Sequence, residues 1–349
     1  MDLKKRIFKH KHNFLVAIVS YFIGVFYNRG LTFNLHSEGL IYNEQAEKLL
    51  IDGLINPYPQ RILTPLIASI FNLSTQHINL IFLFIFLLIF TIYINNLPFI
   101  TKFILTCSIS TTMPIIFSMN FGGYPDIVSY TIFLLILMFN QKKYLPFILF
   151  LLLLLSREAF IVYFPFFVLF KSLNDKNKFT FNFCGYLIAT FVYLVYYYVS
   201  FKIAAGTSGE VWDYSFYLGP LKSNLFFWLE NYSLNYIIGV FSSLKFLTFL
   251  LPIIFLRMNF RQKWLFILFI VLTMSTSLVC GDISRCFSPL LFCIILFPEI
   301  LKFKSLNFTI FILFVLNIFS PKYYVWHGGK LNYLNDSRIH FLDIMKIFN

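Results

Sequence analysis

Long hydrophobic runs separated by short polar segments set the pattern of this chain. A helix needs about 20 apolar residues to cross the hydrocarbon core of a bilayer. The runs that reach or approach this length are residues 12–28, 77–94, 102–119, 126–140, 180–200, 234–256, 262–280, 286–301 and 305–320. The pattern therefore predicts an all-α polytopic membrane protein with about 9–11 transmembrane helices.

Two shorter runs, 144–155 and 159–170, flank the polar triplet Ser156-Arg157-Glu158. Each run has about 12 residues, which is too short to cross a bilayer alone. Together they predict a broken-helix hairpin whose tip carries an ion pair, and whether it crosses fully or is re-entrant stays open. Because Arg157 and Glu158 are adjacent, their side chains diverge on a helix, and each can also bind a different neighbour.

The first long polar segment, 29–76, predicts two short interfacial helices. Ser37 is a candidate N-cap for a helix that runs to about Gly53. Glu44 and Lys48 are four residues apart on this helix, which is the spacing of a simple surface pair. After a proline-rich turn, Arg61 opens a second apolar helix over 62–72.

The composition agrees with a membrane location. Hydrophobic residues make up 59% of the chain and charged residues 12%, whereas soluble domains have about 45–50% and about 25%. No long polar stretch remains to build a soluble domain. We therefore expect residues 1–349 to form a single transmembrane domain, with outer loops at 29–76 and 201–233 and an outer tail at 321–349.

The net charge of +13 would suggest nucleic-acid binding in a soluble protein. Here the excess is better explained by the positive-inside rule, because one set of alternate loops holds 16 of the 28 Lys and Arg but 3 of the 15 Asp and Glu. These loops are 1–11, 95–102, 141–143, 171–178, 257–263 and 299–304. We predict a multi-pass protein of the cell (inner) membrane with a cytoplasmic N-terminus, retained as a signal-anchor, and no nucleic-acid partner.

With this topology, the charged residues near helix ends gather on the opposite, extracytoplasmic face. Charges near a membrane interior are costly, so they are candidates for function. Asp126 could also be an ordinary N-cap, and Asp282 and Arg285 are three residues apart and could simply neutralise each other. The candidates are Glu38, Glu44, Glu47, Asp52, Arg61, Asp126, Arg157, Glu158, Asp282 and Arg285.

Several short motifs occur in order along the chain. They are Glu38 with Tyr42 and the turn into Arg61-Ile62-Leu63-Thr64-Pro65, then Ser156-Arg157-Glu158, then Asp282-Ile283-Ser284-Arg285. In these features the chain resembles bacterial membrane proteins related to the GT-C glycosyltransferases. That family usually has Asp in the first loop where this chain has Glu38, so the catalytic role stays open between Glu38, Glu44 and neither.

The resemblance implies a GT-C-like bundle that takes a sugar from a polyprenyl-phosphate donor and passes it to a cell-envelope glycan or lipid acceptor on the outer side. A carboxylate would accept the proton of the acceptor hydroxyl, or hold a divalent cation against the donor phosphate, and metal dependence is left open. Arginines would bind the phosphate bidentately. The implied catalytic residues are Glu38, Glu44 and Asp126, and the implied substrate-binding residues are Tyr42, Arg61, Arg157, Glu158, Asp282 and Arg285.

Two other functions stay open. A polymerase of O-antigen or capsule repeat units would need a large basic outer loop, and segment 201–236 carries two Lys against three acidic residues. A transporter or flippase for lipid-linked glycans would show internal repeats and charges at mid-membrane, and the sequence has neither pattern. Membrane lipids are expected partners in all three cases.

Overall fold

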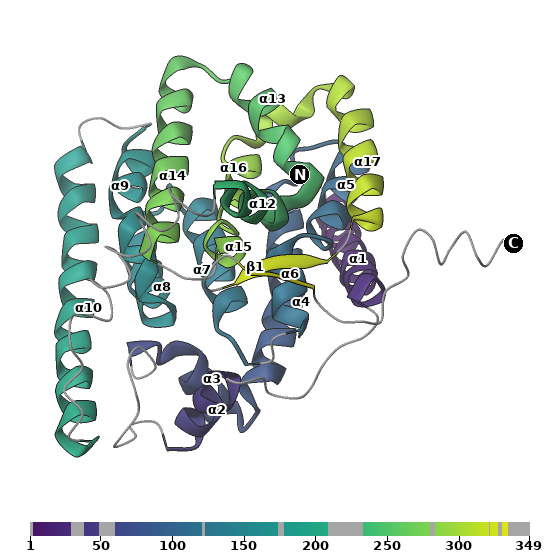
Figure 1. Cartoon of the computed structure of the whole chain (residues 1–349). Coiled ribbons are helices and arrows are strands. Elements are labelled where there is room, and N and C mark those ends of the chain that lie inside the picture. The colour runs from purple at the N-terminus through teal and green to yellow at the C-terminus, as the bar shows by residue number, and fades with distance from the viewer. Residues whose placement is uncertain are drawn as a thin grey trace, which may run out of the picture.

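Each predicted hydrophobic run contains helix in the computed structural model of the chain, although the run 286–301 is divided among two short α-helices and a 3-10 helix (Figure 1). The structure describes residues 3–28, 38–48, 60–120, 123–173, 178–208, 233–279, 283–320, 322–326 and 330–333. The elements of the N-terminal part are α1 (Leu3–Asn28), α2 (Glu38–Lys48), α3 (Leu63–Phe71), α4 (Thr75–Tyr93), α5 (Phe99–Ile109), α6 (Met113–Asn120), α7 (Asp126–Met138), α8 (Leu145–Ser156), the 3-10 helix η2 (Glu158–Tyr163), α9 (Phe164–Ser172) and α10 (Phe179–Ser208).

The C-terminal part contains shorter helices and one small sheet. Its elements are α12 (Ser233–Leu244), the 3-10 helix η4 (Lys245–Phe249), α13 (Leu250–Leu256), α14 (Phe260–Val279), α15 (Ile283–Cys286), α16 (Leu290–Ile295), the 3-10 helix η5 (Pro298–Lys302), α17 (Lys304–Phe319), β1 (Tyr323–Trp326) and β2 (Lys330–Tyr333). The strands pair antiparallel, with Tyr323 opposite Tyr333 and Trp326 opposite Lys330. The prediction of an all-α chain missed this sheet.

Apolar helices of membrane-spanning length occur within the described ranges. Three segments, Thr75–Tyr93, Phe179–Ile203 and Ile237–Leu256, are long and apolar enough to cross a bilayer, and a fourth is obtained if α5 and α6 count as one bent span. Four further helices are apolar but shorter: Asp126–Met138, Leu145–Ser156, Ser284–Ile295 and Leu306–Phe319. The chain is thus a helical protein with several candidate membrane spans, and the predicted total of 9–11 stays a prediction.

The run predicted as one span over 102–119 is broken into α5 and α6, which meet at 48°. The hydroxyls of Ser110, Thr111 and Thr112 donate to the backbone carbonyls three residues earlier, at 2.6–2.7 Å. Such bonds compete with helical hydrogen bonds, and Pro114 at the start of α6 cannot donate one. The run is therefore two helices, which make one bent candidate span if they are counted together.

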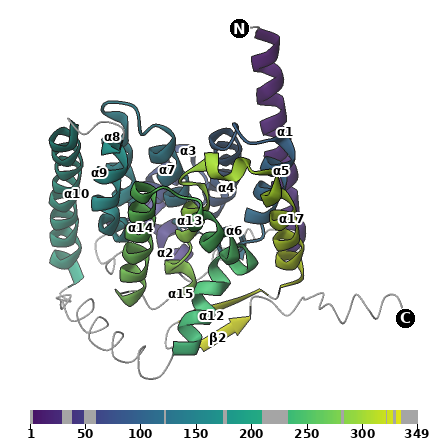
Figure 2. The ribbon, with the colours of Figure 1, turned by 90° about the horizontal axis from the view of Figure 1, so that it is seen from above.

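Helix α7 lies at the centre of the packing. It contacts α4 on one side and α8 on the other, and α1 packs on α4. Its Phe133 is fully buried and stacks on Phe292 of α16 with the ring centroids 4.2 Å apart. In contrast, α10 stands at the edge of the molecule in both ribbon views (Figures 1 and 2), with exposed apolar side chains such as Phe191. An exposed apolar face of this kind suits contact with lipid.

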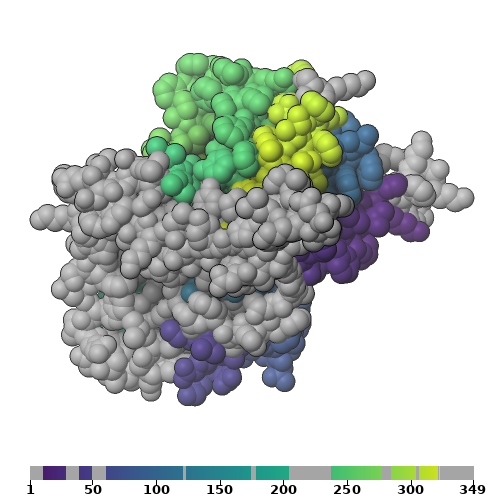
Figure 3. Space-filling view, turned by 45° about the vertical axis from the view of Figure 1, so that its right-hand side comes forward, coloured from purple at the N-terminus to yellow at the C-terminus, as the bar shows by residue number. Residues whose placement is uncertain are grey.

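Two sets of helix ends define the two ends of the bundle. At one end, Lys102 of α5 donates to Asn13 of α1 (2.6 Å), and Lys171 of α9 donates to the Asn140 carbonyl (2.7 Å). The ends that meet on the other side carry the charged candidates described below. In Figure 3, the green α12–α14 region and the yellow α17 lie next to each other.

Candidate functional site

A buried carboxylate, Asp126, accepts hydrogen bonds from two arginines on separate elements. Arg157 directly follows α8 and donates from Nη1 to one carboxylate oxygen. Arg285 of α15 donates from Nε to the other oxygen at 2.9 Å, and its Nη2 lies 2.7 Å from the same atom. Asp126 is 1% exposed and each arginine 6%. The N-cap position of α7 belongs to Pro125, so the alternative prediction of Asp126 as an N-cap is wrong.

A second ion pair lies beside the first. Arg61 donates to both carboxylate oxygens of Glu158, at 2.7 Å from Nε and 2.5 Å from Nη2. Its Nη1 also donates to the hydroxyl of Tyr42, which is fully buried on α2, at 2.8 Å. Burial opposes ionisation of Glu158, but the Arg61 guanidinium outweighs it and keeps the pKa of this carboxyl below its ordinary value.

The backbone at Arg157 explains why two adjacent charges join different pairs. Arg157 is extended (φ −159°, ψ 115°), which ends α8 before the 3-10 helix η2 begins. Side chains of consecutive residues point to opposite sides of an extended backbone. Arg157 therefore reaches Asp126 while Glu158 reaches Arg61, as the alternative interpretation of this pair predicted. An ion pair between the two residues themselves is not formed.

The short helix α2 is fixed against the same cluster. Gly123, three residues before Asp126, has φ +91°, and a Cβ atom there would lie 2.6 Å from the Cα of Gly39. The Thr75 backbone N–H donates to the Asn43 side chain at 3.2 Å. Glycine at 123 is thus required both by its backbone conformation and by the close approach of α2. These contacts hold α2 against the segment that leads into α7.

Aromatic rings and a small cavity surround Arg285. Its guanidinium lies 5.0 Å from the ring centroid of Phe117 and 4.8 Å from that of Tyr124, which suits cation–π attraction. A cavity of about 30 Å³ borders both arginines of the first pair. It is lined by Arg157, Ala159, Phe160, Tyr163, Thr276, Arg285, Cys286 and Pro289.

The arginine–carboxylate cluster, defined as Arg61, Asp126, Arg157, Glu158 and Arg285, brings three guanidiniums and two carboxylates together. The carboxylates hold the guanidiniums in fixed orientations. Arginine forks match the oxygens of a phosphate or carboxylate, and a fixed fork loses little entropy on binding one. The arrangement is therefore suited to bind an anion.

Several predicted site residues lie elsewhere. Glu44 is exposed on α2 and pairs with Lys48 at 3.8 Å, which confirms the simple surface pair. Glu47 is also exposed and accepts a hydrogen bond from Asn43 at 3.4 Å. Glu38 is the first residue of α2, but its side chain lies outside the described part of the structure. Ser37, Asp52 and Asp282 also lie outside the described residues.

Residues beyond the predicted set also belong to the site. Ser129 and Ser156 share a hydrogen bond at 2.7 Å that joins the first turn of α7 to the end of α8. Tyr124, two positions before Asp126, could have been suspected from Gly122-Gly123-Tyr124-Pro125-Asp126, whereas nothing in the sequence marks Phe117. Within the described ranges, no group of three or more His, Cys, Asp or Glu could hold a metal ion.

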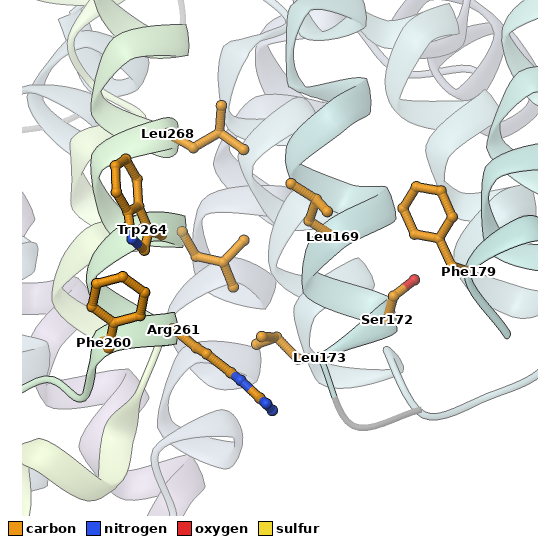
Figure 4. Close-up of a pocket in the computed structure, with 9 residues that line it drawn as sticks. Leu169, Ser172, Leu173, Phe179, Phe260, Arg261, Trp264 and Leu268 are labelled. Carbon is orange, nitrogen blue, oxygen red and sulfur yellow. The ribbon is translucent and has the colours of Figure 1, made fainter. Parts of the chain in front are cut away.

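A larger cavity of about 630 Å³ lies near the opposite ends of α9 and α14 (Figure 4). Its lining is mostly apolar, and Figure 4 shows Trp264 and Leu268 on α14 across from Leu169 on α9. Among the described residues that line it, Arg261 is the charged one. Because the arginine–carboxylate cluster lies at the other ends of these helices, this cavity is separate from the candidate site.

Comparison with protein-family models, with curated proteins and with solved structures returned no match to this chain. The candidate site therefore rests on its own geometry.

Proposed function

We propose that this chain is a GT-C-like membrane glycosyltransferase of the inner membrane. In this proposal it moves a sugar from a polyprenyl-phosphate donor to a cell-envelope glycan or lipid acceptor on the extracytoplasmic face. The observation that carries the proposal is the buried arginine–carboxylate cluster at one end of a bundle of apolar helices. A donor carried by a lipid would reach such a cluster from within the membrane.

The arginines would act on the phosphate of the donor. As the bond between the anomeric carbon and the phosphate oxygen breaks, negative charge builds on the departing polyprenyl phosphate. Preoriented guanidiniums stabilise that charge without reorganising during the reaction. In this role Asp126 and Glu158 are positioning residues, because each uses both carboxylate oxygens to hold arginines.

A different carboxylate is needed to accept the proton from the acceptor hydroxyl as its oxygen attacks the anomeric carbon. Glu44 is exposed and paired with Lys48. Glu38 opens α2 one residue before Gly39, which packs against Gly123 near the cluster. We assign the general base to Glu38, a choice supported by this position in the chain.

Transfer of radiolabel from polyprenyl-phosphate sugars tests the assignment in membranes that contain wild-type protein or a variant. We expect Glu38→Gln to abolish transfer and Glu44→Gln to retain it, with equal amounts of protein in the membrane. Loss of transfer in Glu44→Gln alone would move the base to Glu44. Equal transfer by both variants and wild type would remove the first-loop base from the mechanism.

A further inference from the structure

A groove between α9 and α14 lies at the end of the bundle away from the arginine–carboxylate cluster (Figure 4). It is the cavity of about 630 Å³ described above, and clefts that bind small molecules commonly have about 300–1,000 Å³. Its walls are side chains at helical spacing, which share one face of each helix. They include Leu169 and Leu173 on α9, and Phe260, Trp264 and Leu268 on α14.

The floor of the groove suits a hydrocarbon chain. Leu265 and Ser172 form it, and both are buried. The Ser172 hydroxyl donates to the Val168 carbonyl at 2.7 Å and accepts a hydrogen bond from the Asn182 side chain at 2.9 Å. Because this hydroxyl already bonds within the protein, the floor favours an apolar ligand over a polar one.

Aromatic side chains form the rim of the groove. Phe179, Phe260 and Trp264 line it and are exposed. The rings of Phe260 and Trp264 meet edge to face, with their centroids 6.0 Å apart. Tryptophan prefers the boundary between the hydrocarbon and the headgroups of a bilayer. The rim therefore marks the depth at which an acyl chain in the groove would meet its headgroup.

The chain segments at this end of the groove are basic. Residues 171–178, which join α9 to α10, and residues 257–263, which lead into α14, contain six Lys and Arg and one Asp. Glu299 accepts a hydrogen bond from Gln262 at 3.3 Å, which still leaves basic residues in excess. Arg261 is exposed and lines the groove, and Figure 4 shows its side chain extending from α14 toward the side formed by α9. Basic pockets between membrane helices bind anionic lipid headgroups in this way.

We propose that this groove binds one anionic phospholipid, with an acyl chain between α9 and α14 and the headgroup phosphate against Arg261. The guanidinium binds the phosphate oxygens through charge-assisted hydrogen bonds. A zwitterionic phospholipid has the same chains and no net charge, so the basic segments attract it less. The groove and the arginine–carboxylate cluster lie at opposite ends of the bundle, and this proposal does not depend on sugar transfer.

Quenching of Trp264 fluorescence by brominated lipids measures occupancy of the groove directly. The purified full-length protein carries Trp212→Phe, Trp228→Phe and Trp326→Phe, which leaves Trp264 as the remaining tryptophan of the four. Phosphatidylglycerol or phosphatidylcholine with bromine on the acyl chains is titrated into this protein in micelles of a neutral detergent. We expect half-maximal quenching at a mole fraction about fivefold lower for phosphatidylglycerol, the preference that one basic residue near anionic lipid provides.

Two variants in this background test the two parts of the site. Arg261→Gln should remove the preference for phosphatidylglycerol, and the matched control Lys302→Gln, at an exposed position on η5, should retain it. Leu169→Phe narrows the groove and should shift half-maximal quenching by both lipids to higher mole fractions. Its control is Ile148→Phe, at an exposed apolar position on α8, which should leave the quenching by both lipids unchanged.

Equal quenching by the two lipids before any groove substitution, or a preference that persists in Arg261→Gln, would overturn the proposal. If Arg261→Gln fails to fold, salt decides instead: about 1 M sodium chloride, which shortens the screening length to about 3 Å, should remove the preference. A preference that survives this salt would count against a charged headgroup contact. Quenching that falls as protein concentration rises, at a fixed lipid fraction, would assign the groove to a second copy of the chain and also refute the lipid site.

Discussion

At the residue scale, charges that are far apart in sequence compensate one another in a buried place. The buried Asp126 forms ion pairs with two arginines, whereas the exposed Glu44 forms an ion pair with one lysine at 3.8 Å. Removing one partner from a buried pair leaves an uncompensated charge, which costs far more than losing an exposed pair. The two carboxylates should therefore respond very differently to neutralisation.

We expect Asp126→Asn to lower the free energy of unfolding by about 3–5 kcal/mol, because two buried guanidiniums lose their counter-charge. Glu44→Gln is the control and should change it by less than about 0.5 kcal/mol. Reversible denaturation in detergent measures both. Equal stability of the two variants would contradict the buried ion-pair network.

The lowered pKa of Glu158 should make the free energy of unfolding depend on pH. Its pKa is lower in the folded protein than its ordinary value, chiefly because the charge of Arg61 overcomes the effect of burial. Its contribution to stability is therefore present above the pKa of the unfolded state and lost as the pH falls through the folded-state pKa. As the pH falls from about 5 to about 3, wild type should therefore lose more stability than Glu158→Gln. Parallel pH profiles of the two proteins would count against an ionised Glu158.

At the element scale, breaks and close approaches place the charged residues. The extended backbone at Arg157 divides the hairpin into α8 and η2, and Gly123 allows α2 to pack beside the start of α7. The sequence predicted the existence and approximate bounds of these helices, because a long run of hydrophobic residues indicates a segment that is buried in lipid or in the protein core. It did not predict the break between α5 and α6, which depends on hydroxyls that bond to their own backbone.

The pairing of charges also lay beyond sequence reasoning. From the sequence, we expected Asp126, Arg157 and Arg285 on the same face of the membrane. The distance between residues on separate helices, however, cannot be obtained from their spacing along the chain. Arg285 binds the distant Asp126, and nothing in the spacing of these two residues along the chain indicated that contact. The strands β1 and β2 were missed because a single hairpin of four-residue strands leaves little periodic signal.

We expect Gly123→Ala to detach α2 from the bundle, because the added Cβ would lie 2.6 Å from the Gly39 Cα and the backbone has φ +91°. Hydrogen exchange of the α2 amides measures this, and it should rise about tenfold or more. Leu40→Ala, an exposed position on the same helix, is the control and should leave exchange unchanged. Protection retained in Gly123→Ala would show that α2 does not depend on this contact.

At the scale of the whole molecule, the distribution of charge predicts orientation. The loops assigned to the cytoplasm hold the entire excess of basic residues. The helix ends joined by Lys102 and Lys171 lie opposite those of the arginine–carboxylate cluster. The proposed transfer on the extracytoplasmic face requires the cluster to face away from the cytoplasm.

Reporter fusions test this orientation. Alkaline phosphatase joined after Asn349 should be active and a fluorescent protein there dark, whereas the same reporters inserted at Lys143 should give the opposite result. Reporter activities of the reverse kind would place the cluster in the cytoplasm, where polyprenyl-phosphate sugars on the outer leaflet could not reach it.

The central claim is that the arginine–carboxylate cluster binds the phosphate of a lipid-linked sugar donor during transfer. The most direct measurement is transfer from a panel of radiolabelled polyprenyl-phosphate sugars by purified wild type and Arg285→Lys, which keeps the charge but loses the fork. We predict transfer by wild type from one donor and a rate at least about tenfold lower in the variant, with folding unchanged. Folded wild-type protein that transfers sugar from none of these donors would contradict the claim and favour a polymerase of lipid-pyrophosphate oligosaccharides.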